Sequence, residues 1–79
     1  MSLQIARRLD LKGLACPLPI AKTARAIKEL APGELIESLA TDPGSVPDFT
    51  AWTRATGNDL VEQTVEDGVY RFVIRKKVT

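Results

Sequence analysis

The sequence predicts an α/β fold, specifically a two-layer α+β sandwich whose elements follow the order βαβαββ. Segments with the apolar spacing of helices alternate with short strand-like segments, and an Asp67-Gly68 pair typical of a type I′ turn joins two strand-like segments near the end. Strands of successive βα units pair in parallel through right-handed crossovers, whereas a hairpin is antiparallel. We therefore expect a mixed four-stranded sheet with two helices packed on one face.

The first half of the chain contains one strand and one helix. The strand is expected over about residues 8–12, where Leu9 and Leu11 alternate with charged side chains, and Gly13 ends it. A helix is expected from about Pro17 to Leu30, because Pro32-Gly33 stops it. Its apolar stripe comprises Ile20, Ala24, Ile27 and Ala31.

The second half contains a strand, a helix and the hairpin. A strand over about residues 34–41 leads into a turn at Asp42-Pro43-Gly44. Ser45 is expected to cap the second helix with Asp48 as its capping-box partner, and Gly57 to end it. The hairpin strands are expected over residues 60–66 and 69–76. The apolar face of the second helix comprises Val46, Phe49, Trp52 and Ala55, and we expect Phe49, Trp52 and Phe72 between the layers.

The composition excludes several classes of protein. The 79 residues suit a single domain over residues 1–79. One Cys and no His exclude an internal disulfide, a closed zinc site and a Cys-His or Ser-His catalytic pair. No apolar run approaches the roughly 18 residues of a membrane span, and residues 1–11 lack the apolar core of a signal peptide. We expect a cytoplasmic protein with no membrane partner, metal or cofactor, whose thiol stays free in a reducing compartment.

The most informative segment is Cys16-Pro17-Leu18-Pro19, just after Gly13 in the loop before the first helix. Cys16 is expected at the N-cap, and the two prolines are tolerated in a first turn whose N–H groups have no intrahelical acceptor. The N–H groups of Leu18 and Ile20 would face the sulfur. These groups and the helix dipole favour a negative charge, so we expect a thiol pKa below the roughly 8.5 of free Cys. The alternative is that Cys16 is a small buried apolar residue.

Basic side chains gather near this cysteine in the sequence. Residues 1–28 carry six Lys or Arg and one Asp, whereas residues 29–70 are strongly acidic. Four of the basic residues lie in the loop and on the exposed side of the first helix, and we expect them to dock an acidic partner: Lys12, Lys22, Arg25 and Lys28. Lys12 and Lys22 would also lower the pKa of the thiol. The alternative is an ordinary solvated face.

The pattern around Cys16 resembles that of the small sulfur-carrier proteins of the TusA/SirA type. The resemblance covers nearly the whole chain and continues beyond the Cys-Pro-x-Pro motif. Its further residues are Leu9-Asp10, Gly13-Leu14, Lys22, Gly33-Glu34, Asp42-Pro43-Gly44, Asp48, Trp52, Gly57 and Tyr70-Arg71-Phe72. Leu18 stands where members that serve tRNA thiolation often have an acidic residue, and Asn58 stands where many have His. The run Asp42-Pro43-Gly44-Ser45-Val46, together with Gly57-Asn58, looks more like members associated with oxidative sulfur metabolism.

This resemblance implies both a fold and an activity. It implies a fold similar to the C-terminal domain of translation initiation factor 3. It also implies that Cys16 accepts sulfane sulfur as a persulfide and passes it on. The implied donors are cysteine desulfurases and rhodanese-like or DsrE-like proteins, and the implied acceptors serve tRNA thiolation, cofactor sulfuration or sulfur oxidation. Because the chain has no second thiol, it would act as a sulfurtransferase only together with partner proteins.

Two other functions compete with this one. The first is a nucleic-acid-binding module, which the fold resemblance and the basic ends of the chain favour. A formal net charge of +1 makes direct nucleic-acid binding the weaker prediction. The second is a regulatory adaptor in which Cys16 is a redox sensor, oxidised reversibly without sulfur transfer.

Overall fold

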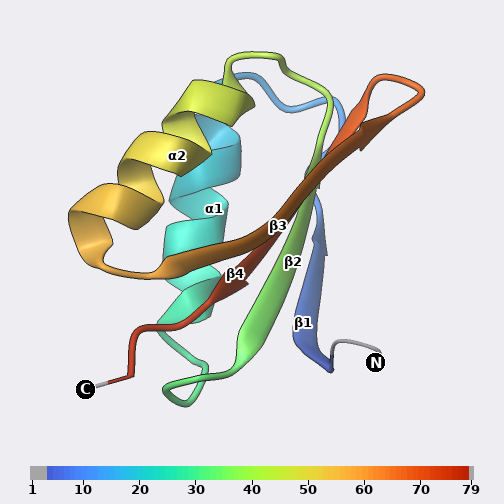
Figure 1. The fold of residues 1–79 in the computed structure, drawn as a ribbon. Coiled ribbons are helices and arrows are strands. Elements are labelled where there is room, and N and C mark those ends of the chain that lie inside the picture. Colours follow the sequence, from blue (N-terminus) through green and yellow to red (C-terminus); the bar gives the residue numbers. More distant parts are fainter. Residues whose placement is uncertain (1–3, 79) are drawn as a thin grey trace.

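Two helices cover one face of a four-stranded sheet, as the sequence predicts (Figure 1). The computed structural model describes residues 4–78, so residues 1–3 and 79 of the expected domain lie outside the described residues. The helices are α1 (Leu18–Ile27) and α2 (Ser45–Thr56). The strands are β1 (Ile5–Asp10), β2 (Leu35–Ala40), β3 (Asp59–Glu66) and β4 (Val69–Arg75).

The sheet is mixed, and its strand order is β1-β2-β4-β3. β1 and β2 are parallel, whereas β4 is antiparallel to both β2 and β3. The hairpin turn has positive φ at both central residues, 51° at Asp67 and 76° at Gly68. A type I′ turn requires this conformation, so the prediction from the Asp-Gly pair is confirmed.

Several element boundaries differ from the prediction. β1 lies over Ile5–Asp10 rather than residues 8–12, because its parallel register with β2 already begins at the pair Ile5–Leu35. α1 ends at Ile27 instead of Leu30. Beyond that point Leu30 N–H donates to Ile27 O at 3.1 Å, which is the tighter i to i−3 bond that often closes a helix.

The core lies between the helices and the sheet. Phe49 of α2 stacks on Phe72 of β4 with ring centroids 4.2 Å apart, and both side chains are fully buried. Trp52 packs edge-on against Phe49 and is half-buried. The expected aromatic core is therefore confirmed.

The buried side of α1 differs from its expected apolar stripe. Ala31 is exposed and Ala24 is half-buried, whereas Thr23 is fully buried. The Thr23 hydroxyl forms a 2.7 Å hydrogen bond with the Ser38 hydroxyl on β2. A threonine can occupy this core position because a side chain from the other layer satisfies its polar atom.

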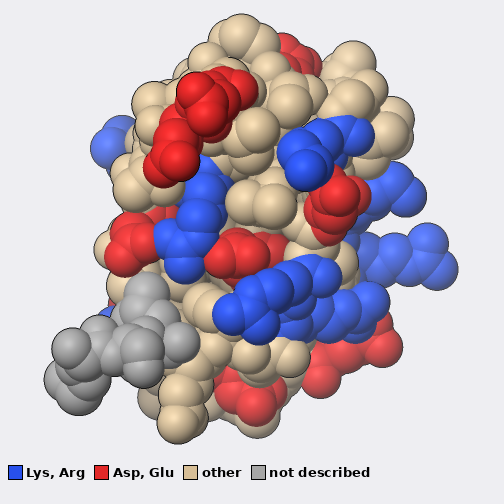
Figure 2. Space-filling model, turned by 90° about the vertical axis from the view of Figure 1, so that its right-hand side faces the viewer, with Lys and Arg blue, Asp and Glu red and all other residues tan. Residues whose placement is uncertain are grey.

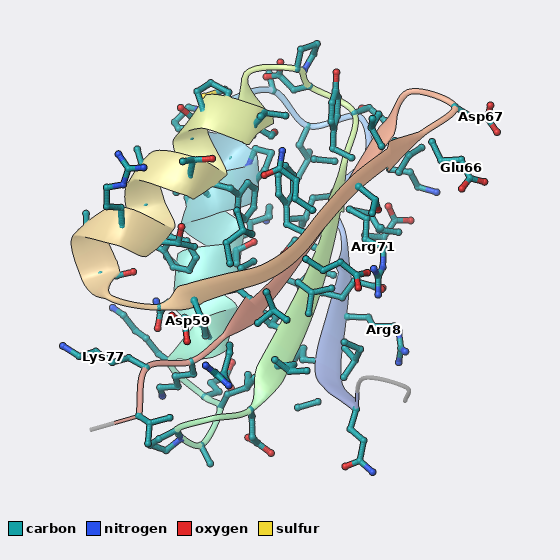
Figure 3. The ribbon with its side chains drawn as sticks, viewed as in Figure 1. Arg8, Asp59, Glu66, Asp67, Arg71 and Lys77 are labelled. Atoms are coloured by element: carbon teal, nitrogen blue, oxygen red, sulfur yellow. The ribbon has the colours of Figure 1, made fainter. Side chains whose placement is uncertain are left out.

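The face of the sheet away from the helices is lined by charged side chains (Figure 2). Arg71 of β4 lies between two carboxylates, donating to Glu37 of β2 at 2.6 Å and to Glu62 of β3. Arg8 of β1 also approaches Glu37, at 3.4 Å. Figure 3 shows Arg8 and Arg71 pointing away from the helices. We call this row of Arg8, Glu37, Arg71 and Glu62 the ionic ladder; it links all four strands.

Candidate functional site

Two loops meet at one edge of the sheet, because the parallel strands β1 and β2 bring their carboxyl ends there (Figure 1). The loop after β1 covers residues 11–17, and the loop after β2 covers residues 41–44. Gly13 N–H donates to Thr41 Oγ1 at 2.9 Å, and Cys16 N–H donates to Asp42 Oδ2 at 2.7 Å. The second loop therefore holds the backbone of Cys16 in place.

Asp42 is the residue that organises this junction. Besides Cys16 N–H, its carboxylate accepts a 3.0 Å hydrogen bond from Gly44 N–H within its own loop. These two backbone bonds lower the pKa of Asp42, since they favour the charged carboxylate. Gly44 passes so close to Cys16 that a Cβ added to it would lie 3.7 Å from Cys16 Cβ.

Asp48 in the first turn of α2 contacts the thiol directly. The Cys16 Sγ–H donates a hydrogen bond to Asp48 Oδ2. The expected capping box is therefore wrong: the N-cap is Gly44, no side chain caps the helix, and the Ser45 hydroxyl is buried without a hydrogen-bond partner in residues 4–78. Asp48 does not fold back on its own helix because its carboxylate is turned toward the cysteine of the other loop.

The Cys16 side chain is exposed, and its charge environment is the opposite of the predicted one. Its pKa is raised, first by the hydrogen bond to Asp48, then by desolvation, and then by the negative charges of Asp48 and Asp42. The expectation of a lowered pKa is wrong because two carboxylates from the second loop and α2 surround the sulfur. At neutral pH the resting group is a thiol.

The start of α1 also differs from the prediction. The N-cap is Pro17, not Cys16. Leu18 N–H donates to Ala15 O at 2.9 Å, so it is not available to the sulfur. Pro19 is fully buried and anchors the first turn in the core, whereas Leu18 is 47% exposed. Gly13, with φ of 85°, provides the left-handed bend of this loop.

The four basic residues predicted to dock a partner are all exposed, but they do not form one cluster. Lys22 and Arg25 line a groove of about 260 Å³ between α1 and β1, whose apolar lining includes Leu9. Lys28 lies instead on a second groove, between α1 and α2. Lys12, in the loop, approaches Asp10 at 3.9 Å.

The groove beside Lys22 and Arg25 contains one basic residue that the sequence did not single out. Arg7 of β1 lies in its lining and pairs with Glu29 at 3.1 Å. Within residues 4–78, no group of three or more Cys, Asp or Glu side chains is arranged to hold a metal ion. No helix in the same range is long and apolar enough to cross a membrane.

Comparison with known proteins assigns this fold and site to a family. The profile of the family described as "Sulfurtransferase TusA" matches residues 7–76. The chain therefore belongs to the sulfurtransferase TusA family, as the resemblance in the sequence predicts.

Curated relatives and a solved structure agree with this assignment. The chain is 50% identical over 68 residues to the "Putative sulfur carrier protein YrkI" of Bacillus subtilis, covering 86% of this chain and 91% of that protein. It is 43% identical over 70 residues to the "Sulfur carrier protein TusA" of Allochromatium vinosum, covering 89% of this chain and 92% of that protein. A SirA-like protein from Desulfitobacterium hafniense shares the fold, with a TM-score of 0.81 at 23% identity over 91% of this chain and 99% of the other.

The two site residues that sequence analysis assigned differently are Asp42 and Asp48. The sequence predicts a turn role for Asp42 and a capping role for Asp48, because Asp is common in those local positions, and both also belong to the residues that carry the family resemblance. Their contacts with Cys16 span 26 and 32 residues of sequence. The only signal that could have linked them to Cys16 is the parallel βαβ topology, which brings the two loops to the same edge of the sheet.

Proposed function

We propose that this protein is a sulfur carrier that accepts sulfane sulfur as a persulfide on Cys16 and relays it to partner proteins. The observation that carries the proposal is the position of its single thiol, exposed at the junction of the two loops in a chain of the sulfurtransferase TusA family. Cys16 attacks the outer sulfur of a donor persulfide, the donor's S–S bond breaks, and the donor keeps a thiol. An acceptor nucleophile later attacks the same sulfur and regenerates the Cys16 thiol.

The chain needs partner proteins for both steps. It has one Cys and no His, so it has neither a resolving thiol nor an imidazole base of its own. The donors that fit are cysteine desulfurases and rhodanese-like or DsrE-like proteins, and the acceptors are proteins of tRNA thiolation, cofactor sulfuration or sulfur oxidation. A reducing compartment such as the cytoplasm suits this role, since it keeps the thiol free between transfers.

Two features of the structure disfavour the competing functions. Redox-sensing cysteines are those with a high thiolate fraction, whereas the pKa of Cys16 is raised. Nucleic-acid binding needs basic side chains free to contact phosphates. On the open face of the sheet, however, Arg8 and Arg71 are paired with carboxylates of the ionic ladder.

Intact-mass measurement tests the carrier function. After incubation with a cysteine desulfurase and cysteine, the wild-type protein is expected to gain the mass of one sulfur atom, which a reductant removes. Cys16→Ser is the matched control, because it changes one atom and is expected to stay unloaded. An unchanged wild-type mass under conditions that load an established carrier would overturn the proposal.

We further propose that the groove lined by Lys22 and Arg25 docks an acidic surface of the donor or acceptor. Lys12 and Lys28, which are exposed outside this groove, would contact the same partner only beyond it. The groove has an apolar lining that includes Leu9, and a basic rim, which suits an acidic partner surface with apolar contacts. Rim charges act mainly on the association rate and its salt dependence. Reversal of the Lys22 and Arg25 charges should therefore slow transfer from an acidic donor at low salt.

A further inference from the structure

The proposed transfer requires the thiol of Cys16 to lose its proton. The thiolate is the nucleophile in reactions of cysteine, and hydroxide is scarce at neutral pH. The residue that accepts this proton must lie within hydrogen-bond reach of Sγ. Within residues 4–78, the side chain that contacts Sγ through a hydrogen bond is Asp48.

We propose that Asp48 is the general base of sulfur loading and the general acid of sulfur release. This inference rests on the proposed carrier function and assigns to Asp48 a chemical role in it. The carboxylate takes the proton from Cys16 Sγ as the sulfur attacks, and it returns a proton to the sulfur that leaves.

The fold holds Asp48 rigidly for this task. Asp48 lies in the first turn of α2, and its neighbour Phe49 is fully buried and stacked on Phe72. One turn further on, the buried Thr53 hydroxyl donates to Phe49 O at 2.8 Å. The rotation of α2 about its axis is therefore set by the core, and with it the direction of the Asp48 side chain toward the thiol.

The second carboxylate near the thiol cannot replace Asp48. Both oxygens of Asp42 accept backbone N–H groups, from Cys16 and Gly44, and these bonds lower its pKa. Such a carboxylate is a weak proton acceptor, so its role is to position the backbone of Cys16. Asp48, by contrast, has no ion pair with any Lys or Arg in residues 4–78, where the cations that form ion pairs contact other acids.

The other charged groups near Cys16 leave this assignment intact. From the loop of Cys16 itself, Lys12 approaches Asp10. From α1, Lys22 and Arg25 line the groove against β1. The groups that raise the pKa of the thiol are thus Asp48 of α2 and Asp42 of the second loop.

The proton balance closes without an external reagent. In loading, a bond forms between Cys16 Sγ and the outer sulfur of the donor persulfide, and the S–S bond of the donor breaks. The donor sulfur leaves as a thiolate and receives the proton that Asp48 took from Sγ. In release, the acceptor nucleophile gives its proton to Asp48 as it bonds to the outer sulfur, Sγ leaves as a thiolate, and Asp48 passes that proton to Sγ. The electrons stay within the sulfur atoms, so no oxidant or reductant is needed.

Asp48→Asn separates this role from mere control of the thiol pKa. Asn keeps the shape and one acceptor oxygen but accepts no proton. Loss of the negative charge is expected to lower the pKa of Cys16, measured by thiolate absorbance, and to speed its alkylation by iodoacetamide at pH 7. Loading by the desulfurase is nevertheless expected to slow about 100-fold, the lower end of what general acid–base catalysis contributes. The deficit is expected to shrink as pH rises and the thiol ionises without help.

The controls keep the test decisive. Asp67→Asn removes the same charge at the tip of the hairpin, where Asn-Gly also suits the turn (Figure 3), and it should change none of these measurements. Asp48→Glu retains a carboxylate and should load faster than Asp48→Asn even if either variant is less stable. Loading by Asp48→Asn as fast as by wild type, or faster, would overturn the proposal. If wild type itself does not load, the carrier function fails instead, whereas the absorbance titration still reports whether Asp48 sets the thiol pKa.

Discussion

The thiol junction, which comprises Cys16, Asp42 and Asp48, and the ionic ladder both place carboxylates beside a titratable group, with opposite consequences. On the open face of the sheet, Glu37 and Glu62 raise the pKa of Arg71, chiefly through the hydrogen bond from Arg71 to Glu37. These carboxylates keep a cation charged. At the thiol junction, Asp48 and Asp42 raise the pKa of Cys16 and so keep a thiol neutral.

The difference lies in whether each carboxylate has a cationic partner. In the ladder the Glu37 side chain is only 12% exposed, and its charge is compensated by Arg8 and Arg71. At the junction, Asp48 contacts a neutral sulfur that can give up its proton. A compensated carboxylate stabilises the sheet, whereas an uncompensated one beside a nucleophile is available for proton transfer. This distinction predicts that the two regions respond differently to substitution.

The largest effect on stability is expected in the ladder, from Arg71→Met. This change leaves the mostly buried Glu37 with only the exposed Arg8 as partner, and should lower the free energy of unfolding by about 2 kcal/mol, below the cost of breaking a fully buried pair. Urea denaturation measures it, and sulfur loading of the folded variant should stay at the wild-type rate.

The matched control for this prediction is Arg75→Met. Arg75 pairs with Asp59 on the same face, but both side chains are at least half exposed. The free energy of unfolding should therefore fall by about 0.5 kcal/mol or less. Equal losses of unfolding free energy in Arg71→Met and Arg75→Met would contradict the view that burial of Glu37 makes the ladder more stabilising than an exposed ion pair.

A kinetic effect is expected at the groove beside the junction, from Lys22→Glu combined with Arg25→Glu. Reversal of both rim charges should slow transfer from an acidic donor about tenfold at low salt, and the deficit should shrink at high salt as the charges are screened. The rate of Cys16 alkylation by iodoacetamide should change little, since this reaction involves no partner protein.

A charge reversal at a distance provides the control for the groove. Lys77→Glu changes an exposed lysine beyond β4, outside the groove of Lys22 and Arg25. It should leave the transfer rate unchanged. Transfer by the Lys22 and Arg25 variant at the wild-type rate would show instead that this helix face is only solvated.

The smallest effect is expected in the pH dependence of stability, from Asp42→Asn. The pKa of Asp42 is lowered in the folded protein, so its carboxylate stabilises the fold above the pKa of about 4 of unfolded Asp, and this is lost as pH falls through the folded value. The variant lacks this contribution. Its unfolding free energy should lie below that of wild type at pH 7, and the two should converge in acid. A constant difference from pH 7 to pH 3 would contradict this account.

The element order could be predicted from the sequence because its signals are local. Apolar spacing located both helices, and the Asp67-Gly68 pair located the hairpin turn. The sequence predicts a start of β1 that is too late, because Ile5-Ala6-Arg7 shows no alternation and the pairing of β1 with β2 decides where the strand begins. The end of α1 and the burial of Thr23 likewise depend on what packs against the helix, here Ser38 of β2.

The candidate site likewise has one part that follows from the sequence and another that depends on the tertiary structure. By itself the sequence determined which residue we propose as the nucleophile, since Cys16 is the only thiol, and it determined the order of loops and helices that surrounds Cys16. Only the tertiary structure decided the chemistry of that thiol. Asp48 lies 32 residues away and was free to cap its own helix, but the parallel pairing of β1 and β2 brings the two loops together and turns its carboxylate toward the sulfur. The local sequence preference of Asp for helix capping cannot reveal that Asp48 turns toward Cys16. The pKa of the thiol depends on the charges near it in space and not on its neighbours in sequence.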